Sequence, residues 1–102
     1  MDRPGERLLS TLMEPWISYG GRLKVTLFPN PAKDFLDVKV KVSQPFHKGG
    51  VLTIYDEDDL KKMVVFIQLG ENRIEIQDLE PGIYSVRIDW EEEEKWLRFV
   101  KH

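Results

Sequence analysis

The chain of 102 residues has no cysteine, so disulfide bonds and thiolate metal sites are excluded. It also has no run close to the roughly 18 to 20 apolar residues that a membrane-spanning helix needs, and we expect no membrane insertion. Lysine and arginine (15) are fewer than aspartate and glutamate (18), which gives a net charge of −3. Because binding to phosphate backbones requires a basic face, this balance argues against a nucleic-acid partner.

Histidine is scarce, with only His47 in a glycine-rich loop and His102 at the end of the chain. Neither lies in a recognisable nucleophile motif, and there is no Gly-x-Ser-x-Gly sequence. A glycine-rich phosphate-binding loop is also absent. We therefore expect a protein that is not an enzyme and that uses no cofactor.

Acidic residues cluster in two short runs, at 56–59 and 91–94. Clustered carboxylates suit calcium, but the spacing of an EF-hand loop fails in the first run. Leu60 and Lys61 stand where that loop needs an oxygen ligand and a glycine. We expect solvated turns without a metal, and a mobile loop at 91–94 because four adjacent carboxylates repel one another.

Residues 1–22 differ in texture from the remainder of the chain. Pro15 and the pair Gly20-Gly21 interrupt regular structure there. No secretory signal peptide is recognisable in this segment, so an exported chain would carry its signal outside this sequence. We expect a linker or a short N-terminal arm over 1–22 and one domain over 23–102. The apolar residues of the segment recur at helical spacing: Leu8, Leu9, Leu12, Met13 and Trp16.

From residue 23 onward the apolar residues alternate with polar ones, which predicts half-buried strands. The run 63–69 is almost continuously apolar, and we expect a strand covered on both faces. Turns are expected at 70–72 and at Pro81-Gly82. No helix long enough for a parallel crossover separates the strands, so an all-β antiparallel sandwich of two sheets follows. The seven expected strands are 23–27, 36–42, 51–55, 63–69, 73–77, 84–90 and 95–101.

Two stretches carry more specific information. Pro29 and Pro31 lack backbone donors and flank Asn30, which predicts a rigid corner that does not pair with a strand. Further on, a Leu, a Pro-Gly turn and Tyr84 precede an alternating strand. This order is typical of a tyrosine corner, in which the phenol bonds to the backbone a few residues upstream.

Together these stretches resemble the type A C-terminal sorting domain of the type IX secretion system. The resemblance covers about residues 23–102. It departs from the family pattern at Asp59 and at 91–94, where members often have glycine. The matching motifs, in order, are Phe28-Pro29-Asn30-Pro31, Ile54-Tyr55-Asp56, Gly70-Glu71-Asn72, Leu79-Glu80-Pro81-Gly82-Ile83-Tyr84 and Val100-Lys101-His102.

The resemblance implies a seven-stranded immunoglobulin-like sandwich that does no chemistry. Such a domain takes its cargo from the periplasm through an outer-membrane translocon, to the cell surface or the medium, and a sortase-like peptidase commonly removes it. The partners it implies are therefore translocon and sortase components. The expected recognition residues are Pro29, Asn30, Pro31, Gly82, Tyr84, Val100 and Lys101.

Three other expectations concern the surface. By strand parity Trp90 faces the core, whereas Trp96 can lie exposed and could serve a stand-alone adhesion or carbohydrate-binding module. Lys39 and Lys41, with Asp37, form an outward stripe that protects a sheet edge or docks a translocon component. A plain spacer domain is a further alternative, and self-association through a sheet edge fits all of these functions. Deleting 100–102 is expected to abolish export with little loss of fold.

Overall fold

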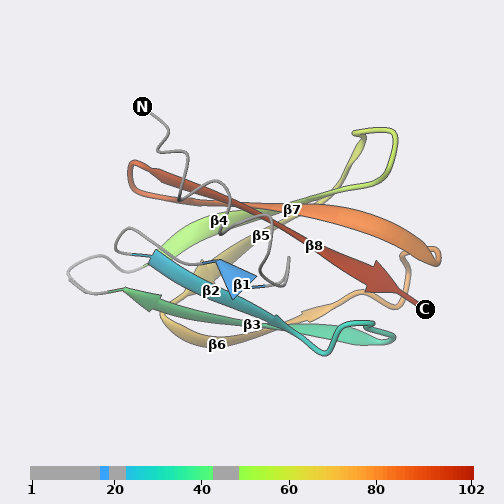
Figure 1. Ribbon diagram of the computed structural model, residues 1–102, viewed down its shortest axis with the longest axis horizontal. Helices are drawn as coiled ribbons and strands as arrows, with labels where there is room; N and C mark the ends of the chain where they lie inside the picture. The colour runs from blue at the N-terminus through green and yellow to red at the C-terminus, as the bar shows by residue number, and fades with distance from the viewer. Residues whose placement is uncertain (1–16, 19–22, 43–48) are drawn as a thin grey trace, which may run out of the picture.

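The computed structural model describes residues 17–18, 23–42 and 49–102, which form a sandwich of two four-stranded antiparallel sheets (Figure 1). The first sheet has the order β1-β2-β3-β6, and the second has the order β5-β4-β7-β8. No helix in the described ranges is long and apolar enough to cross a membrane. The strands are β1 (Ile17–Ser18), β2 (Leu23–Phe28), β3 (Phe35–Val42), β4 (Gly49–Tyr55), β5 (Lys61–Gln68), β6 (Gly70–Glu75), β7 (Gly82–Trp90) and β8 (Glu93–Lys101).

The prediction of an all-β antiparallel sandwich is confirmed, and the seven expected strands correspond to β2–β8. The additional strand β1 has two residues and pairs Ile17 with Thr26 of β2. It lies in the segment expected to be an N-terminal arm. The apolar stripe predicted within residues 1–16 lies outside the described residues, and the domain boundary at residue 22 stays a prediction.

The core lies between the two sheets and is built from alternate residues of each strand. In β2 the buried residues are Leu23, Val25 and Leu27. Trp90 is buried in the same core, as its parity predicted. Burial of apolar surface at about 25 cal/mol per Å² is the main force that holds such layers together. Strand parity therefore assigns most core side chains, and Asp37 and Thr53 are buried on the opposite parity.

Strand β5 corrects the prediction for the run 63–69. The strand is not covered on both faces: Phe66 is 84% exposed and Val64 is 52% exposed. In a sandwich of two sheets only the inner face of a strand meets the other layer. Because β5 lies at the edge of the second sheet, a neighbouring strand flanks it on one side only. Met63, Val65 and Ile67 occupy that inner face and pack on the core.

The predicted turn at 70–72 is also wrong, because β6 begins at Gly70. The chain instead crosses from one sheet to the other at Leu69, and Gly70 adopts a φ of 89°, which glycine takes without steric cost. The Asn72 side chain fixes this crossing. It accepts a hydrogen bond from the Gln68 backbone nitrogen (2.9 Å) and donates one to the Gln68 carbonyl (2.8 Å) and one to the Val38 carbonyl (3.3 Å).

The loop predicted at 91–94 is a tight hairpin turn. Trp90 pairs with Glu93, so Glu91 and Glu92 alone connect β7 to β8. Glu91 takes the positive φ (58°) for which the sequence offers no glycine. Asp59 also has a positive φ (64°), in agreement with the tolerance of aspartate for that region. Repulsion between the carboxylates therefore does not prevent a short turn between two well-paired strands.

Candidate functional site

The seven expected recognition residues come together at one end of the sandwich, although they lie far apart in the sequence. The corner between β2 and β3 and the end of β8 meet there, near the C-terminus (Figure 1). The start of β7 completes the cluster, since Gly82 pairs with Lys101 and Tyr84 pairs with Phe99. We call this set the motif cluster: Pro29, Asn30, Pro31, Gly82, Tyr84, Val100 and Lys101.

Asn30 connects the proline corner to β8 through its side chain. Its Oδ1 atom accepts a hydrogen bond from the Val100 backbone nitrogen (2.9 Å), and its Nδ2 atom donates to the Arg98 carbonyl (3.4 Å). The carboxamide thus acts as a neighbouring strand would, with one acceptor and one donor. The asparagine between the two prolines consequently has a structural role that the sequence did not reveal.

Ala32 extends this contact and corrects the prediction that the corner does not pair. The prolines do end β2 at Phe28, but Ala32 forms a parallel bridge with Lys101. Its nitrogen donates to the Val100 carbonyl (2.7 Å), and the His102 nitrogen donates to the Ala32 carbonyl (2.8 Å). The corner of the first sheet therefore holds the last strand of the second.

The two C-terminal motif residues point in opposite directions. Lys101 is buried, and its Nζ atom donates to the His102 carbonyl (3.0 Å). Val100 is 40% exposed and lies beside the exposed Ile83. Because 100–102 make several main-chain bonds, their deletion removes part of the fold. These bonds argue against the expectation that truncation costs little stability, which stays untested, and a single outward side chain such as Val100 is the better probe.

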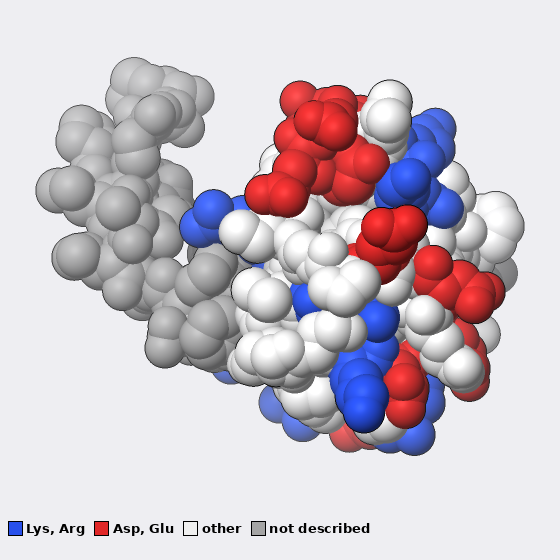
Figure 2. Space-filling model, turned by 90° about the vertical axis from the view of Figure 1, so that its right-hand side faces the viewer, with Lys and Arg blue, Asp and Glu red and all other residues white. Residues whose placement is uncertain are grey.

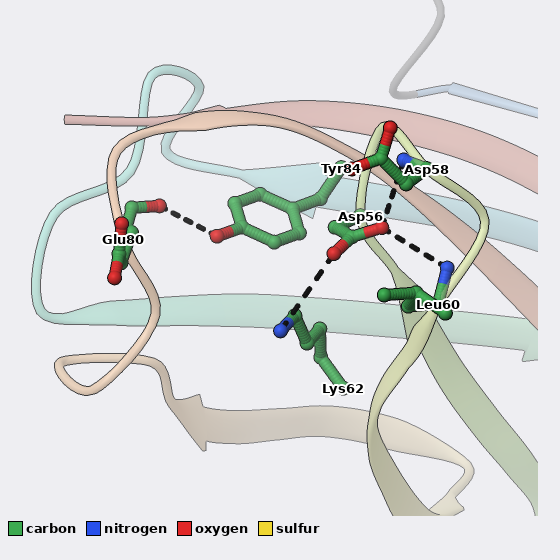
Figure 3. A network of polar contacts seen from close by, with 6 residues as sticks. All are labelled: Asp56, Asp58, Leu60, Lys62, Glu80 and Tyr84. Carbon is green, nitrogen blue, oxygen red and sulfur yellow. Dashed lines mark hydrogen bonds and ion pairs between the residues drawn. The ribbon is translucent and has the colours of Figure 1, made fainter.

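The tyrosine corner predicted at Tyr84 is confirmed. Its hydroxyl donates a hydrogen bond to the Glu80 carbonyl (2.6 Å; Figure 3). Its ring stacks on Phe99 with 5.4 Å between ring centroids. Burial, assisted by the negative charge of Glu80 and Asp56, raises the pKa of Tyr84 above its usual value. The phenol therefore remains a neutral donor at physiological pH and holds the turn that leads into β7.

The acidic run 56–59 is organised by Asp56. Its Oδ1 atom accepts hydrogen bonds from the backbone nitrogens of Leu60 (3.0 Å) and Asp58 (2.8 Å), and its Oδ2 atom lies 3.6 Å from Lys62 Nζ (Figure 3). The bond from Leu60 is the main cause that lowers the pKa of Asp56, with Asp58 and Lys62 assisting. The carboxylate thus caps a turn. Within the described ranges no group of three histidine, aspartate or glutamate side chains is placed to hold a metal ion.

A groove with a volume of about 630 Å³ opens beside Tyr84, between the turns that precede β5 and β7. Six carboxylates and one lysine contribute to its wall, so the groove is electronegative at neutral pH. Figure 2 faces this end of the molecule and shows acidic side chains gathered over its upper part. The charged residues that line the groove are Asp56, Glu57, Asp58, Lys62, Glu75, Asp78 and Glu80.

The other predicted surface features lie away from the motif cluster. Trp96 is 53% exposed, but it stacks on Tyr55 and its Nε1 atom donates to Glu94 (2.6 Å), so part of the ring is already engaged. Lys41 is exposed as expected. Asp37 is not a solvated neighbour, because it is buried under a two-bond ion pair with Arg73 (2.9 and 3.1 Å).

The comparisons with known proteins agree with this geometry. A family model described as a secretion system C-terminal sorting domain matches residues 26–102, about three quarters of the chain. The match includes every residue of the motif cluster. No curated protein and no solved structure matches the chain.

Proposed function

The chain belongs to the family of secretion system C-terminal sorting domains, and from this premise we propose that the type IX translocon recognises the motif cluster. The domain functions as a C-terminal sorting signal for type IX secretion. This function implies contact with the secretion machinery and a secreted or surface-located protein. In this proposal the protein passes through the periplasm, the outer-membrane translocon recognises the domain, and a sortase-like peptidase removes it.

The observation that carries the proposal is the bond between Asn30 and Val100 (2.9 Å). It joins the family's entry motif to its C-terminal motif, which are 70 residues apart in the sequence. A rigid corner and a fixed terminal strand give a partner a preformed surface, so little conformational entropy is lost on binding. Val100 has an exposed side chain (40%), as do Pro29 and Pro31, and unlike them it lies in a regular strand.

The proposal assigns no chemical step to the domain. The polar groups at the motif cluster are engaged in the fold, as the Tyr84 hydroxyl is with the Glu80 carbonyl and Lys101 Nζ with the His102 carbonyl. Removal of the domain from its cargo, where it occurs, is carried out by the partner peptidase, which cleaves upstream of the sandwich.

The experiment that tests recognition compares two matched substitutions in a fusion protein. Residues 1–102 are placed behind a reporter that enters the periplasm of a bacterium with a type IX translocon. Val100→Asp adds a charge to the motif cluster, and Val64→Asp adds the same charge to an exposed valine of the same sheet, away from the cluster. We expect the first fusion to stay in the periplasm and the second to reach the surface or the medium.

Thermal unfolding of both isolated variants serves as the control, since each side chain is outward-facing and unfolding should occur at similar temperatures. Equal export of the two fusions, with both proteins folded, would contradict recognition at the motif cluster.

A carbohydrate-binding function remains the alternative, and among the described residues the exposed face of Trp96 supports it. It predicts saturable binding to glycans that is lost in Trp96→Ala. Self-association through a sheet edge also stays a prediction, and β5 is the edge that would carry it.

A further inference from the structure

Strand β5 lies at an edge of its sheet, and no other described strand pairs with its outer side. It is the terminal strand of the order β5-β4-β7-β8, and within the described ranges it pairs with β4 alone. An uncovered edge carries unpaired backbone groups and is a template for a further strand. Here the edge also carries Phe66 and Val64, the former with 84% and the latter with 52% of its surface exposed. Such an apolar edge strand is uncommon on a protein that remains alone in solution.

The direction of the free backbone groups follows from Gln68. Both its nitrogen and its carbonyl bond to the Asn72 side chain, so both point away from β4. In an antiparallel ladder, residues that face the partner alternate with residues that face away. Phe66 and Val64 share the parity of Gln68, and the register with β4 is regular between them. Their N–H and C=O groups therefore face the free edge.

We propose that a second copy of this chain pairs with β5 in antiparallel orientation, with the two-fold axis at Val65. In this register Val64 of each copy lies opposite Phe66 of the other copy, and the two pairs exchange four backbone hydrogen bonds. Aromatic and β-branched residues are favourable cross-strand pairs. The four side chains form one apolar cluster on the outer face, and the two sheets become a single sheet of eight strands.

The charges on β5 favour this register over its neighbours. With the axis at Val65, Lys62 lies opposite Gln68 and Lys61 lies opposite Leu69, so no two lysines meet. Moving the axis to Val64 places Phe66 opposite Lys62. Moving it to Phe66 places Val64 opposite Gln68, whose backbone groups are already bonded to Asn72, and leaves only the bonds of the Phe66 pair. With the axis at Val65 the blocked pair is the outer one, Lys62 and Gln68, and the bonds of Val64 and Phe66 are kept. The edge is therefore most complementary to itself in a single register.

The contact is limited to one strand edge and one apolar cluster. Interfaces below about 1,200 Å² of total area are characteristic of weak, reversible complexes. We therefore expect a dimer that forms as the concentration rises, with a dissociation constant between about 1 µM and 1 mM.

A cross-linking experiment tests the register. The chain has no cysteine, so one introduced cysteine reports one position. Across the axis, two Val65→Cys residues have Cα atoms about 4.5 Å apart, within the range of a disulfide. Two Gln68→Cys residues lie six positions apart across the pair, or about 20 Å. Under mild oxidation we expect a covalent dimer from Val65→Cys and none from Gln68→Cys. Equal cross-linking of both would overturn the proposal.

Sedimentation velocity over about 10 µM to 1 mM tests the same proposal without a cross-link. Val64→Pro removes an edge donor that points away from β4, which an edge strand tolerates, and Phe66→Lys replaces the exposed ring with a charge. We expect both to remain monomeric while the wild type and the control Ile83→Lys, an exposed residue of β7, shift towards dimer. A monomeric wild type throughout, or a dimer that survives both β5 variants, would overturn the proposal. So would a wild type that stays monomeric and pairs only with a translocon component.

Discussion

At the scale of single residues, the fold is fixed at two places by side chains that replace strand hydrogen bonds. Asn30 bonds to the main chain of β8, and Asn72 bonds to the main chain at the end of β5. Both contacts close a gap that regular pairing leaves open. The sequence showed that Asn30 stands at a corner, but local patterns carry no information on a partner 70 residues away.

Tyr84→Phe tests the tyrosine corner. The change removes the bond to the Glu80 carbonyl (2.6 Å) and keeps the stacking on Phe99. We expect the free energy of unfolding to fall by about 1 kcal/mol, because one buried hydrogen bond contributes about that much. Urea denaturation measures it. Tyr55→Phe is the matched control, and an unchanged midpoint for Tyr84→Phe would show that the phenol does not hold the corner.

Asp56 gives the fold a defined pH dependence. Its folded pKa lies below the unfolded value of about 3.9. Between these two pKa values the unfolded chain therefore binds more protons than the folded one. Stability from Asp56 is therefore complete above the unfolded pKa and is lost as pH falls through the folded pKa. We expect Asp56→Ala to be less stable than the wild type at pH 7. The gap should narrow below pH ~3, because the protonated carboxyl keeps an oxygen for the turn but loses its charge.

Asp56→Asn separates the charge from the turn. The amide keeps an oxygen for the backbone nitrogens of Leu60 and Asp58 at every pH, but it offers Lys62 no charge. Its stability difference from Asp56→Ala should not vary with pH. A gap between wild type and Asp56→Ala that is constant from pH 7 to pH 2 would show that the carboxylate does not titrate with folding.

At the scale of strands, alternation predicted which segments pair and which side chains enter the core. It could not predict which strand lies at an edge, because the apolar run 63–69 reads the same in the centre of a sheet as at its margin. The expected strand began at residue 51, after the glycine-rich loop of His47, whereas Gly50 is the second residue of β4. Here the absence of a side chain, and not a turn, explains the glycine.

Gly50→Ala tests this explanation. A Cβ atom at this position would lie 2.5 Å from the Asp89 carbonyl oxygen and 2.6 Å from the Trp90 ring. Both neighbours belong to the adjacent strand and the core, so we expect a loss of about 1–3 kcal/mol from overpacking. Urea denaturation measures the loss, and an unchanged midpoint for Gly50→Ala would contradict the packing argument.

At the scale of the whole molecule, the sequence allowed the sandwich, the tyrosine corner and the family to be predicted. The contacts that bring the motifs together could not be predicted from the sequence. Ala32 of the first sheet's corner bonds to Val100 and His102 at the end of the second sheet. The last residues of the described domain are thus part of its architecture.

The most direct measurement follows the location of a cargo. Residues 1–102 are fused behind a periplasm-directed reporter, and the reporter is quantified on the surface and in the medium of strains with and without a functional type IX translocon. We predict most of the reporter outside the cell in the first strain and its retention in the periplasm in the second. Equal distribution in the two strains, with the fusion intact and folded, would contradict the sorting function.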